Sequence, residues 1–537
     1  MSVQDAPQEV RDLTGLLTPE LQLQEVDLAR IVPDLAAYHA RFAPLFARAE
    51  QRAWAAVYLR GLLTADVPRK NIEAMALRLL GAGPGAEHRV RALQHFVGEG
   101  AWDDAALLAE HQRCVEETLG EDDGVLIIDG SDIPKQGTHS AGVARQWCGA
   151  TGKKDTCQAG VFLAYASHKG ATLLDRRLYL PALWFTDEYA ERWRVCAIPP
   201  HTRFQTKHEL AGDLVEQVVG GGRLRARWAT CDEGFGDDPV FLDRVTGQGL
   251  LYLAEVPCDT QVWPLQDPAT GQPRPQPQVW VPPQTASRKG PAPRRPRLQP
   301  KSPPKMRVEA IAAQLPATAW QRYRILEGSK GPLVADFAAV RALAVRDRLP
   351  GPEVWVVLRR KVSGHPDVPV LKHYRSNASA DTPLDTLVWV SGMRWPIESC
   401  FSEGKGEVGL DHYELRFWPG WHHHMTLVFL AHHFLVQLQA RLDQRGGGPR
   451  HAPAPPRSAA AHDGASPAAA LRSGSRGLPP ARARPTPQRG RGAPPAVRSA
   501  APPTPHPVGG AGPAVLSTAA QAGRLSLASQ APAAPAC

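Results

Sequence analysis

The sequence lacks the marks of several protein classes. It has no apolar run near the roughly 18 residues that a membrane-spanning helix needs, and its start, MSVQDAPQEVRDL, lacks the basic-then-apolar order of a signal peptide. None of the eight cysteines forms a C-x-x-C pair, which disfavours both a structural zinc site and a disulfide framework. We therefore expect a cytoplasmic protein with reduced thiols and no membrane partner.

The net charge of +9 belongs to one end of the chain. Residues 446–537 contain ten Arg, no Lys and a single acid, Asp463, so this segment carries the whole excess and residues 1–445 are neutral. The overall basic balance is therefore no evidence that the folded part binds nucleic acid, and any such case depends on local patches.

The same C-terminal segment has no aromatic residue and is rich in Ala, Pro, Gly, Arg and Ser. Such a composition cannot bury enough apolar area to fold, so we predict a disordered tail over residues 446–537. Its abrupt onset after Arg445 is also what a shifted reading frame in a GC-rich gene would produce, and the protein sequence leaves that alternative open.

Residues 1–120 are predicted to form a helical domain. Apolar residues recur at helical spacing in five segments of this region. These segments are 35–49, 52–63, 71–80, 88–97 and 101–119.

From residue 121 the pattern changes to alternating strands and helices, typical of an α/β core. The predicted strands are 124–129, 157–166, 171–180, 225–232 and 250–256, and the predicted helices are 207–219 and 238–247. We assign residues 121–256 to the first part of this core. Residues 381–445 form its second part, with helical sequence at 384–409 and a long buried helix at 421–442.

Between these two parts, residues 257–380 are predicted to form a Pro-rich basic linker and a β-rich insertion. Its strand candidates are 323–328, 353–362 and 370–376. A basic run without any acid lies in it. The run consists of Arg288, Lys289, Arg294, Arg295, Arg297, Lys301, Lys305 and Arg307. It is either a solvated linker or a flexible arm over DNA phosphates.

Three acids stand where acids are otherwise unfavourable. Asp129 is predicted to end the strand 124–129, Asp232 to end the strand 225–232, and Glu398 to lie on a later helix. Singly, each fits a turn or a solvated helix face. Together, two acids at strand ends and one from a helix can hold two divalent ions roughly 4 Å apart for phosphoryl transfer. Asp132 is the alternative to Asp129, but we expect it in a loop beyond the strand.

Several longer stretches carry a family resemblance. They are YLRGLL (58–63), ALQHF (92–96), LIIDGSDIPKQGTHSAGVARQWCG (126–149), FQTKHELA (204–211), CDEGFG (231–236), YLAEVPCDTQVW (252–263), RWPIESCF (394–401) and GLDHYELRFWPGWHHHMTLVFLAHHFL (409–435). In this order the chain resembles transposases of the Asp-Asp-Glu (DDE) superfamily, and more narrowly the 701 family of bacterial insertion sequences. The resemblance covers roughly residues 50–445.

The resemblance implies a ribonuclease-H-like catalytic domain, interrupted by the β-rich insertion and preceded by a helical domain for DNA. By it, Asp129, Asp232 and Glu398 take the metal-binding acid positions, with Mg²⁺ or Mn²⁺ as the cofactor. A related transposase pattern, Tyr-x2-Arg-x3-Glu-x6-Lys, is matched by Arg394, Glu398 and Lys405, but Ser391 stands where the pattern has Tyr.

Helix geometry gives an independent check on the third acid. Glu398 and Lys405 lie within about 20° of each other around a helix, whereas Glu403 lies about 140° from Glu398. Lys405 can therefore reach a DNA phosphate beside Glu398. The DNA-binding residues predicted from the sequence are Arg394, Lys405, Arg294, Arg295 and Arg297.

The histidines of 422–424, with His432 and His433, have no i, i+4 spacing that would suit a metal pair. We expect them to be structural.

The sequence thus predicts a transposase that cleaves double-stranded DNA at terminal inverted repeats and joins it to target DNA. It is expected to act as a homodimer at synapsis and to be associated with the nucleoid. One alternative is an inactive transposase relic that only binds DNA. Another is a two-carboxylate sugar hydrolase, which leaves Arg394 and Lys405 unexplained.

Truncation after Arg445 tests the predicted tail. Deleting residues 446–537 is expected to weaken non-specific DNA binding and to flatten its salt dependence, because these arginines offer charge without sequence information. Cleavage at element ends should persist. The measurement is binding to random-sequence DNA across a salt titration. Loss of end recognition would make the tail a genuine domain, and rescue of an inert chain by another reading frame after Arg445 would favour the relic.

Overall fold

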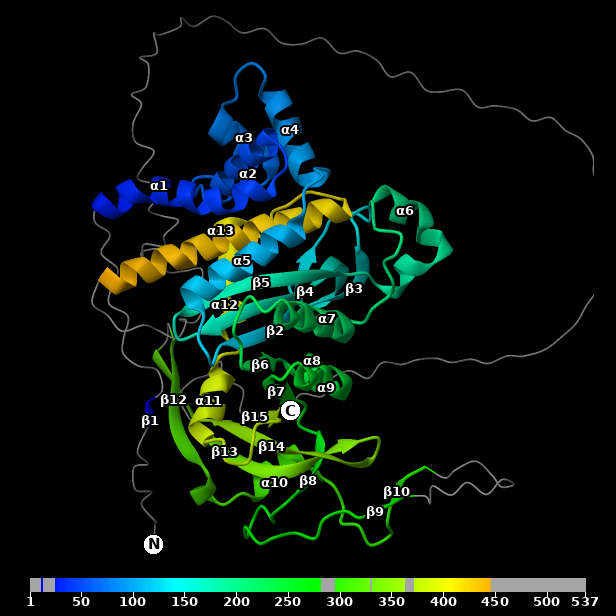
Figure 1. Cartoon of the computed structure of the whole chain (residues 1–537). Helices are drawn as coiled ribbons and strands as arrows, with labels where there is room; N and C mark the ends of the chain where they lie inside the picture. The colour runs from blue at the N-terminus through cyan, green and yellow to red at the C-terminus, as the bar shows by residue number, and fades with distance from the viewer. Residues whose placement is uncertain (1–10, 13–24, 282–294, 329–330, 363–370, 446–537) are drawn as a thin grey trace, which may run out of the picture. The chain divides into compact units, whose positions relative to one another are not determined.

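The computed structural model describes residues 11–12, 25–281, 295–328, 331–362 and 371–445 (Figure 1). All of them belong to one of the two units into which the chain divides, Met1–Arg476. The predicted tail and Arg294 lie outside the described residues. No helix in these ranges is long and apolar enough to cross a membrane.

Five strands form the centre of a large mixed sheet, in the order β5-β4-β2-β6-β7. They are β2 (Val125–Pro134), β4 (Lys153–Ser167), β5 (Gly170–Tyr179), β6 (Trp228–Cys231) and β7 (Leu251–Val256). β4 is antiparallel to both β2 and β5, whereas β6 is parallel to β2 and β7 is parallel to β6. This mixed α/β arrangement is consistent with the expected ribonuclease-H-like fold, and all five predicted core strands are present.

The sheet continues beyond β7 through the β-rich segment. Strands β15 (Leu371–Ser376), β14 (Leu349–Lys361), β13 (Gly331–Arg346) and β12 (Gln321–Gly328) follow as antiparallel neighbours, and β1 (Arg11–Asp12) pairs in parallel with β12. The shorter strands are β3 (Ala144–Cys148), β8 (Gln261–Pro264), β9 (Val279–Trp280), β10 (Arg297–Leu298) and β11 (Met306–Arg307). The three predicted strands of this segment are confirmed, but the long β13 and all the short strands (β1, β3, β8, β9, β10 and β11) were not predicted.

The N-terminal helices are α1 (Glu25–Phe42), α2 (Ala49–Leu62), α3 (Ile72–Leu80), α4 (Ala86–Gly98) and α5 (Asp104–Leu119). The helix predicted over 35–49 is confirmed only for residues 35–42. α1 ends at Phe42 and a short 3-10 turn follows, which contains Pro44. Proline lacks the N–H that an α-helical hydrogen bond needs. Asn71 and Asp103 begin α3 and α5 as helix caps, by accepting hydrogen bonds from backbone N–H groups.

The remaining helices are α6 (Ala190–Val195), α7 (Lys207–Gly220), α8 (Glu233–Gly236), α9 (Pro239–Gly247), α10 (Val308–Gln314), α11 (Leu384–Gly392), α12 (Pro396–Val408) and α13 (Trp418–Arg445). The helical segment predicted over 384–409 is thus two helices, separated just before Pro396. Proline at the first position of a helix is favoured because its N–H needs no partner there.

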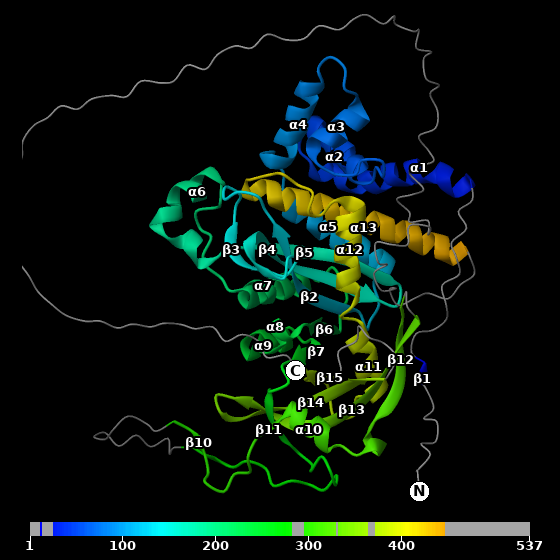
Figure 2. The same ribbon diagram turned by 180° about the vertical axis from the view of Figure 1, so that it is seen from behind.

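Helices cover both faces of the central strands, and β2 shows why. Val125 and Ile127 belong to the apolar cluster shared with α5, α12 and α13, whereas Leu126 and Ile128 belong to the cluster shared with α7 and α9. Successive residues of a strand point to opposite faces, so an apolar run is buried on both sides. Figure 2 shows α12 beside α13 on the first of these faces.

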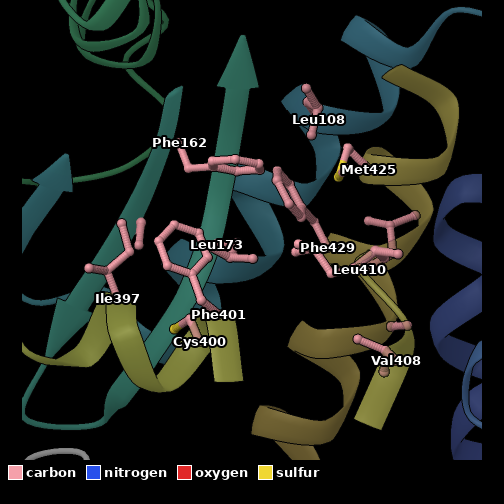
Figure 3. Packing of buried hydrophobic residues seen from close by; sticks show 14 of the residues in the cluster. Leu108, Phe162, Leu173, Ile397, Cys400, Phe401, Val408, Leu410, Met425 and Phe429 are labelled. Carbon is pink, nitrogen blue, oxygen red and sulfur yellow. The ribbon is translucent and has the colours of Figure 1, made fainter. Parts of the chain in front are cut away.

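Aromatic packing fixes α12 against the sheet. Phe162 on β4 has its ring centroid 5.3 Å from that of Phe401 on α12 and 6.3 Å from that of Phe429 on α13 (Figure 3). Phe162 is also the cross-strand partner of Asp129 on β2. The same contact therefore places α12, which carries Glu398, over Asp129.

All five histidines of α13 are hydrogen-bonded and four of them, all but His422, are buried, which confirms the structural interpretation. His424 contacts the Tyr58 hydroxyl (2.8 Å) and Gly409 O (3.2 Å), and His433 contacts the hydroxyls of Tyr38 (3.1 Å) and Thr118 (2.9 Å). Burial lowers the pKa of His424 to about 3. His424 and His433 therefore stay neutral in the folded protein, and their hydrogen bonds link α13 to the N-terminal helices.

Replacing His424 by Gln tests this linkage. A histidine whose pKa is lowered on folding takes up its proton more readily in the unfolded chain, so stability falls as pH drops below about 6.5. Between pH 6 and 4, the wild type should lose about 1.4 kcal/mol more per pH unit than His424→Gln, which does not titrate. Chemical denaturation at a series of pH values measures this difference. Parallel stability profiles for the two proteins would contradict it.

Candidate active site

Three carboxylates lie in a row across neighbouring parallel strands. The register pairs Ile128 of β2 with Cys231 of β6, and Cys231 with Ala254 of β7. The next residue on each chain segment is acidic: Asp129, Asp232 and Glu255. Paired residues in neighbouring strands point to the same face, so the three carboxylates share one side of the sheet.

Asp129 does not end its strand, contrary to the sequence-based expectation. β2 continues to Pro134 with an unbroken register against β4. Asp132 therefore lies in the strand and not in a loop. It is three positions from Asp129 and so faces the other side of the sheet, where its Oδ2 accepts a hydrogen bond from Gly149 N (2.7 Å). The geometry separates Asp132 from the acid row.

Asp232 directly follows β6 and begins α8. Its Oδ1 accepts a hydrogen bond from Phe235 N (3.2 Å), as a helix N-cap does. α8 approaches β7 closely, because a Cβ on Gly236 would lie only 1.9 Å from Glu255 O. The glycine therefore allows Asp232 and Glu255 to be held side by side.

Glu398 reaches the row from α12. It lies on the first turn of this helix, two residues after Pro396, and its side chain is 35% exposed. Lys405 on the same helix is half-buried. Glu403 turns elsewhere, since its Oε2 lies 3.2 Å from Nε2 of His432 on α13. This contact agrees with the predicted helical phase.

Arg394 lies between carboxylates from three parts of the chain. Its Nη2 donates a hydrogen bond to Glu398 Oε1 (3.0 Å), its Nη1 lies 3.7 Å from Asp129 Oδ2, and its Nε lies 3.5 Å from Glu255 Oε2. The sequence predicted Arg394 as a DNA contact, whereas its side chain is only 17% exposed and faces acids. Ser391, which replaces the Tyr of the transposase pattern, donates its hydroxyl to Val388 O (2.7 Å) within α11.

Sequence reasoning missed Glu255. Its side chain is 7% exposed and also forms an ion pair with Lys372 of β15. The sequence does contain a sign of it, because Glu255 is the one charged residue in the apolar strand predicted over 250–256. Only the strand register shows that it stands beside Asp232.

The acid cluster, which is the acid row together with Glu398, has more negative charge than its neighbouring cations offset. Burial raises the pKa of Asp129 to about 7, helped by the negative charges of Asp232 and Glu398 and opposed by Arg394. Burial disfavours the charge of Arg394, yet the carboxylates of Glu255, Asp129 and Glu398 outweigh it and raise the pKa of the guanidinium. The acids therefore carry more negative charge than the neighbouring cations neutralise.

The donors suit a hard divalent cation. Among the described residues, no three His, Cys, Asp or Glu side chains stand close enough together to hold a metal ion. Carboxylate oxygens are nevertheless the ligands that Mg²⁺ prefers, and a cation beside Asp129 would offset the burial and the neighbouring negative charges that raise the pKa of its carboxyl. The acid row and Glu398 thus offer the type of donor that such an ion takes.

The described part of the predicted basic arm, residues 295–307, lies on loops and short strands. Arg295 and Arg297 are exposed, and the Arg297 guanidinium lies 5.1 Å from the ring centroid of Trp280. Within the described ranges, no contact joins these arginines to the acid cluster.

A comparison with protein families matches residues 41–332, more than half of the chain, to a family described as DDE superfamily endonuclease. The matched segment includes Asp129, Asp232 and Glu255 and ends before Glu398. No curated protein matches the chain.

Replacing Asp129 by Asn tests the charge imbalance. A carboxyl whose pKa rises on folding from its usual 3.8 to about 7 binds more protons in the folded state between these values, so stability falls as pH rises from 4 to 7. Asp129→Asn removes this loss. With divalent ions removed by chelator, the variant should be more stable than the wild type above pH 7. The expected difference is about 1.4 kcal/mol for each pH unit between the pKa of the unfolded chain and that of the folded protein. The difference should disappear near pH 4. Thermal unfolding across this pH range measures it, and a pH-independent difference would refute it.

Proposed function

This chain belongs to the DDE superfamily of endonucleases, and from this we propose that it is a transposase of the kind encoded by the 701 family of bacterial insertion sequences. It cleaves phosphodiesters at the two ends of its element, and the freed 3′ hydroxyl then attacks target DNA. The acid row carries the proposal: Asp129 on β2 and Asp232 directly after β6 each follow a residue of the register pair Ile128–Cys231, and α12 brings Glu398 to the same face.

Asp129, Asp232 and Glu398 are the proposed ligands of Mg²⁺ or Mn²⁺. The chemistry that such ions supply in phosphoryl transfer is activation of the attacking oxygen and stabilisation of the leaving oxygen. The chain holds two of the ligands rigidly, Asp129 within β2 and Asp232 at the N-cap of α8. Glu398 is the more exposed and adjustable ligand.

Basic residues from two parts of the chain are proposed to hold the DNA backbone. Lys405 lies on α12 with Glu398, and its ammonium can pair with a phosphate. Arg295 and Arg297 (with Arg294) offer a second, sequence-independent contact, in which Trp280 supports Arg297. Arg394 can contribute positive charge from within the cluster. The helices of residues 1–120 are the proposed DNA-binding domain, and the interruption of the catalytic domain by residues 257–380 remains part of the proposal.

The proposed substrate has two ends, and this determines the proposed oligomeric state. Both ends of an element are cut together, so the working form is a homodimer that holds two terminal inverted repeats. The DNA flanking the gene supplies these ends, and the nucleoid is the place of action.

Substitution of the acids tests the activity. Asp129→Asn, Asp232→Asn and Glu398→Gln should each lower cleavage of element-end DNA by at least about 100-fold, the scale on which loss of one electrostatic stabiliser slows catalysis. Binding to the same DNA, measured by mobility shift, should persist because the basic residues are untouched. Chelation of divalent ions should stop the wild-type reaction.

Two matched controls accompany these variants. Asp132→Asn changes an acid on the opposite face of β2, and Glu403→Gln changes an acid on the opposite face of α12. Both should cleave normally. An acid variant that still cleaves would remove that residue from the site, and a wild type that binds element ends without cutting them would favour the inactive relic.

A further inference from the structure

Glu255 is a buried carboxylate with one unused oxygen. Its Oε1 pairs with Lys372, while its Oε2 forms no hydrogen bond among the described residues. The Nε of Arg394 lies 3.5 Å from Oε2, but without hydrogen-bond geometry. Burying a charged oxygen without a hydrogen bond is costly, so this arrangement needs a reason.

Arg394 has only one close partner in the cluster. It donates to Glu398 Oε1 at 3.0 Å, and its contacts with Asp129 and Glu255 are longer, at 3.7 and 3.5 Å. The guanidinium carries five N–H donors in a rigid fork, so it can turn between carboxylates without losing its charge. A small rotation of the guanidinium would replace Glu398 by Glu255 as its hydrogen-bond partner.

The two carboxylates differ in burial and in how they are held. Glu255 lies within the buried strand β7, one residue after the register pair Cys231–Ala254, and is tied to Lys372. Glu398 lies on the first turn of a helix and is partly exposed. When Glu398 turns towards a cation beside Asp129 and Asp232, Arg394 loses its hydrogen bond, and Glu255 Oε2 is the acceptor already in place.

We propose that Glu255 is a positioning residue that receives Arg394 when Glu398 becomes a ligand of a divalent cation. This inference rests on the proposed function, because it assumes that the acid row holds such an ion. The exchange keeps Arg394 paired in both states. Glu255 thereby sets how readily Glu398 is released, and so how tightly the protein binds its ions.

The test measures Mn²⁺ binding to the full chain without DNA, by the electron paramagnetic resonance signal of free Mn²⁺. Glu255→Gln keeps the size of the side chain but removes the charge that attracts Arg394. Its affinity for Mn²⁺ should fall roughly 10- to 100-fold, the usual effect of losing a group that orients a metal ligand. Glu255→Asp should recover part of the loss.

A double substitution separates positioning from direct ligation. In an Arg394→Gln background, Glu398 no longer needs to be released, so adding Glu255→Gln should leave Mn²⁺ affinity unchanged. An equal loss in both backgrounds would overturn the proposal, as would a wild-type affinity in Glu255→Gln itself. Asp336→Asn is the matched control. Asp336 is also a buried strand carboxylate between two cations, Arg322 and Arg360, and should not affect Mn²⁺ binding.

A second variant covers the case in which Glu255→Gln does not fold, and the wild-type result separates this inference from the proposed function. Should Glu255→Gln alone fail to fold, adding Lys372→Gln removes the lysine left without its partner, and the same loss of affinity is expected. A wild type that does not bind Mn²⁺ would overturn the proposed function and this inference with it. A wild type that binds Mn²⁺ through Asp129, together with an unaffected Glu255→Gln, would overturn this inference alone.

Discussion

Negative charge held close together in a buried place is the constraint on which this molecule depends. Asp129, Asp232 and Glu255 follow one another across three strands because their register leaves no other arrangement. Water would screen such charges, but the interior does so weakly, and the pKa of Asp129 rises accordingly. Arg394 and Lys372 reduce the repulsion, and the remaining charge is what makes the cluster a candidate for cations.

The apolar core serves this constraint by fixing where the third carboxylate comes from. α12 is held by Phe401 against Phe162, the strand partner of Asp129, so the helix cannot slide along the sheet without opening that contact. α13 lies behind it and is tied through buried histidines to α1, α2 and α5. Apolar packing, and not the acids themselves, therefore fixes where α12 brings Glu398 relative to the acid row.

Local patterns predicted most elements correctly, because strands and helices follow from the spacing of apolar residues within one segment. Asp129 and Asp232 were found in the same way, as acids that follow apolar runs. β13 was missed because its sequence, GPLVADFAAVRALAVR, is rich in Ala, which strands disfavour, and its pairing with β12 and β14 compensates. The full length of β2 depends in the same way on its pairing with β4. Glu255 and the surroundings of Arg394 depend on strand register and on contacts between residues 129, 255 and 398, which no single segment contains.

The central claim is that Asp129, Asp232 and Glu398 together bind divalent cations. Crystals of the protein soaked in Mn²⁺ and measured at the manganese absorption edge test it most directly. The account predicts anomalous peaks at ligand distance from Asp129 and Asp232, with Glu398 turned towards them and away from Arg394. Anomalous peaks elsewhere on the protein, with these three carboxylates unliganded, would contradict it.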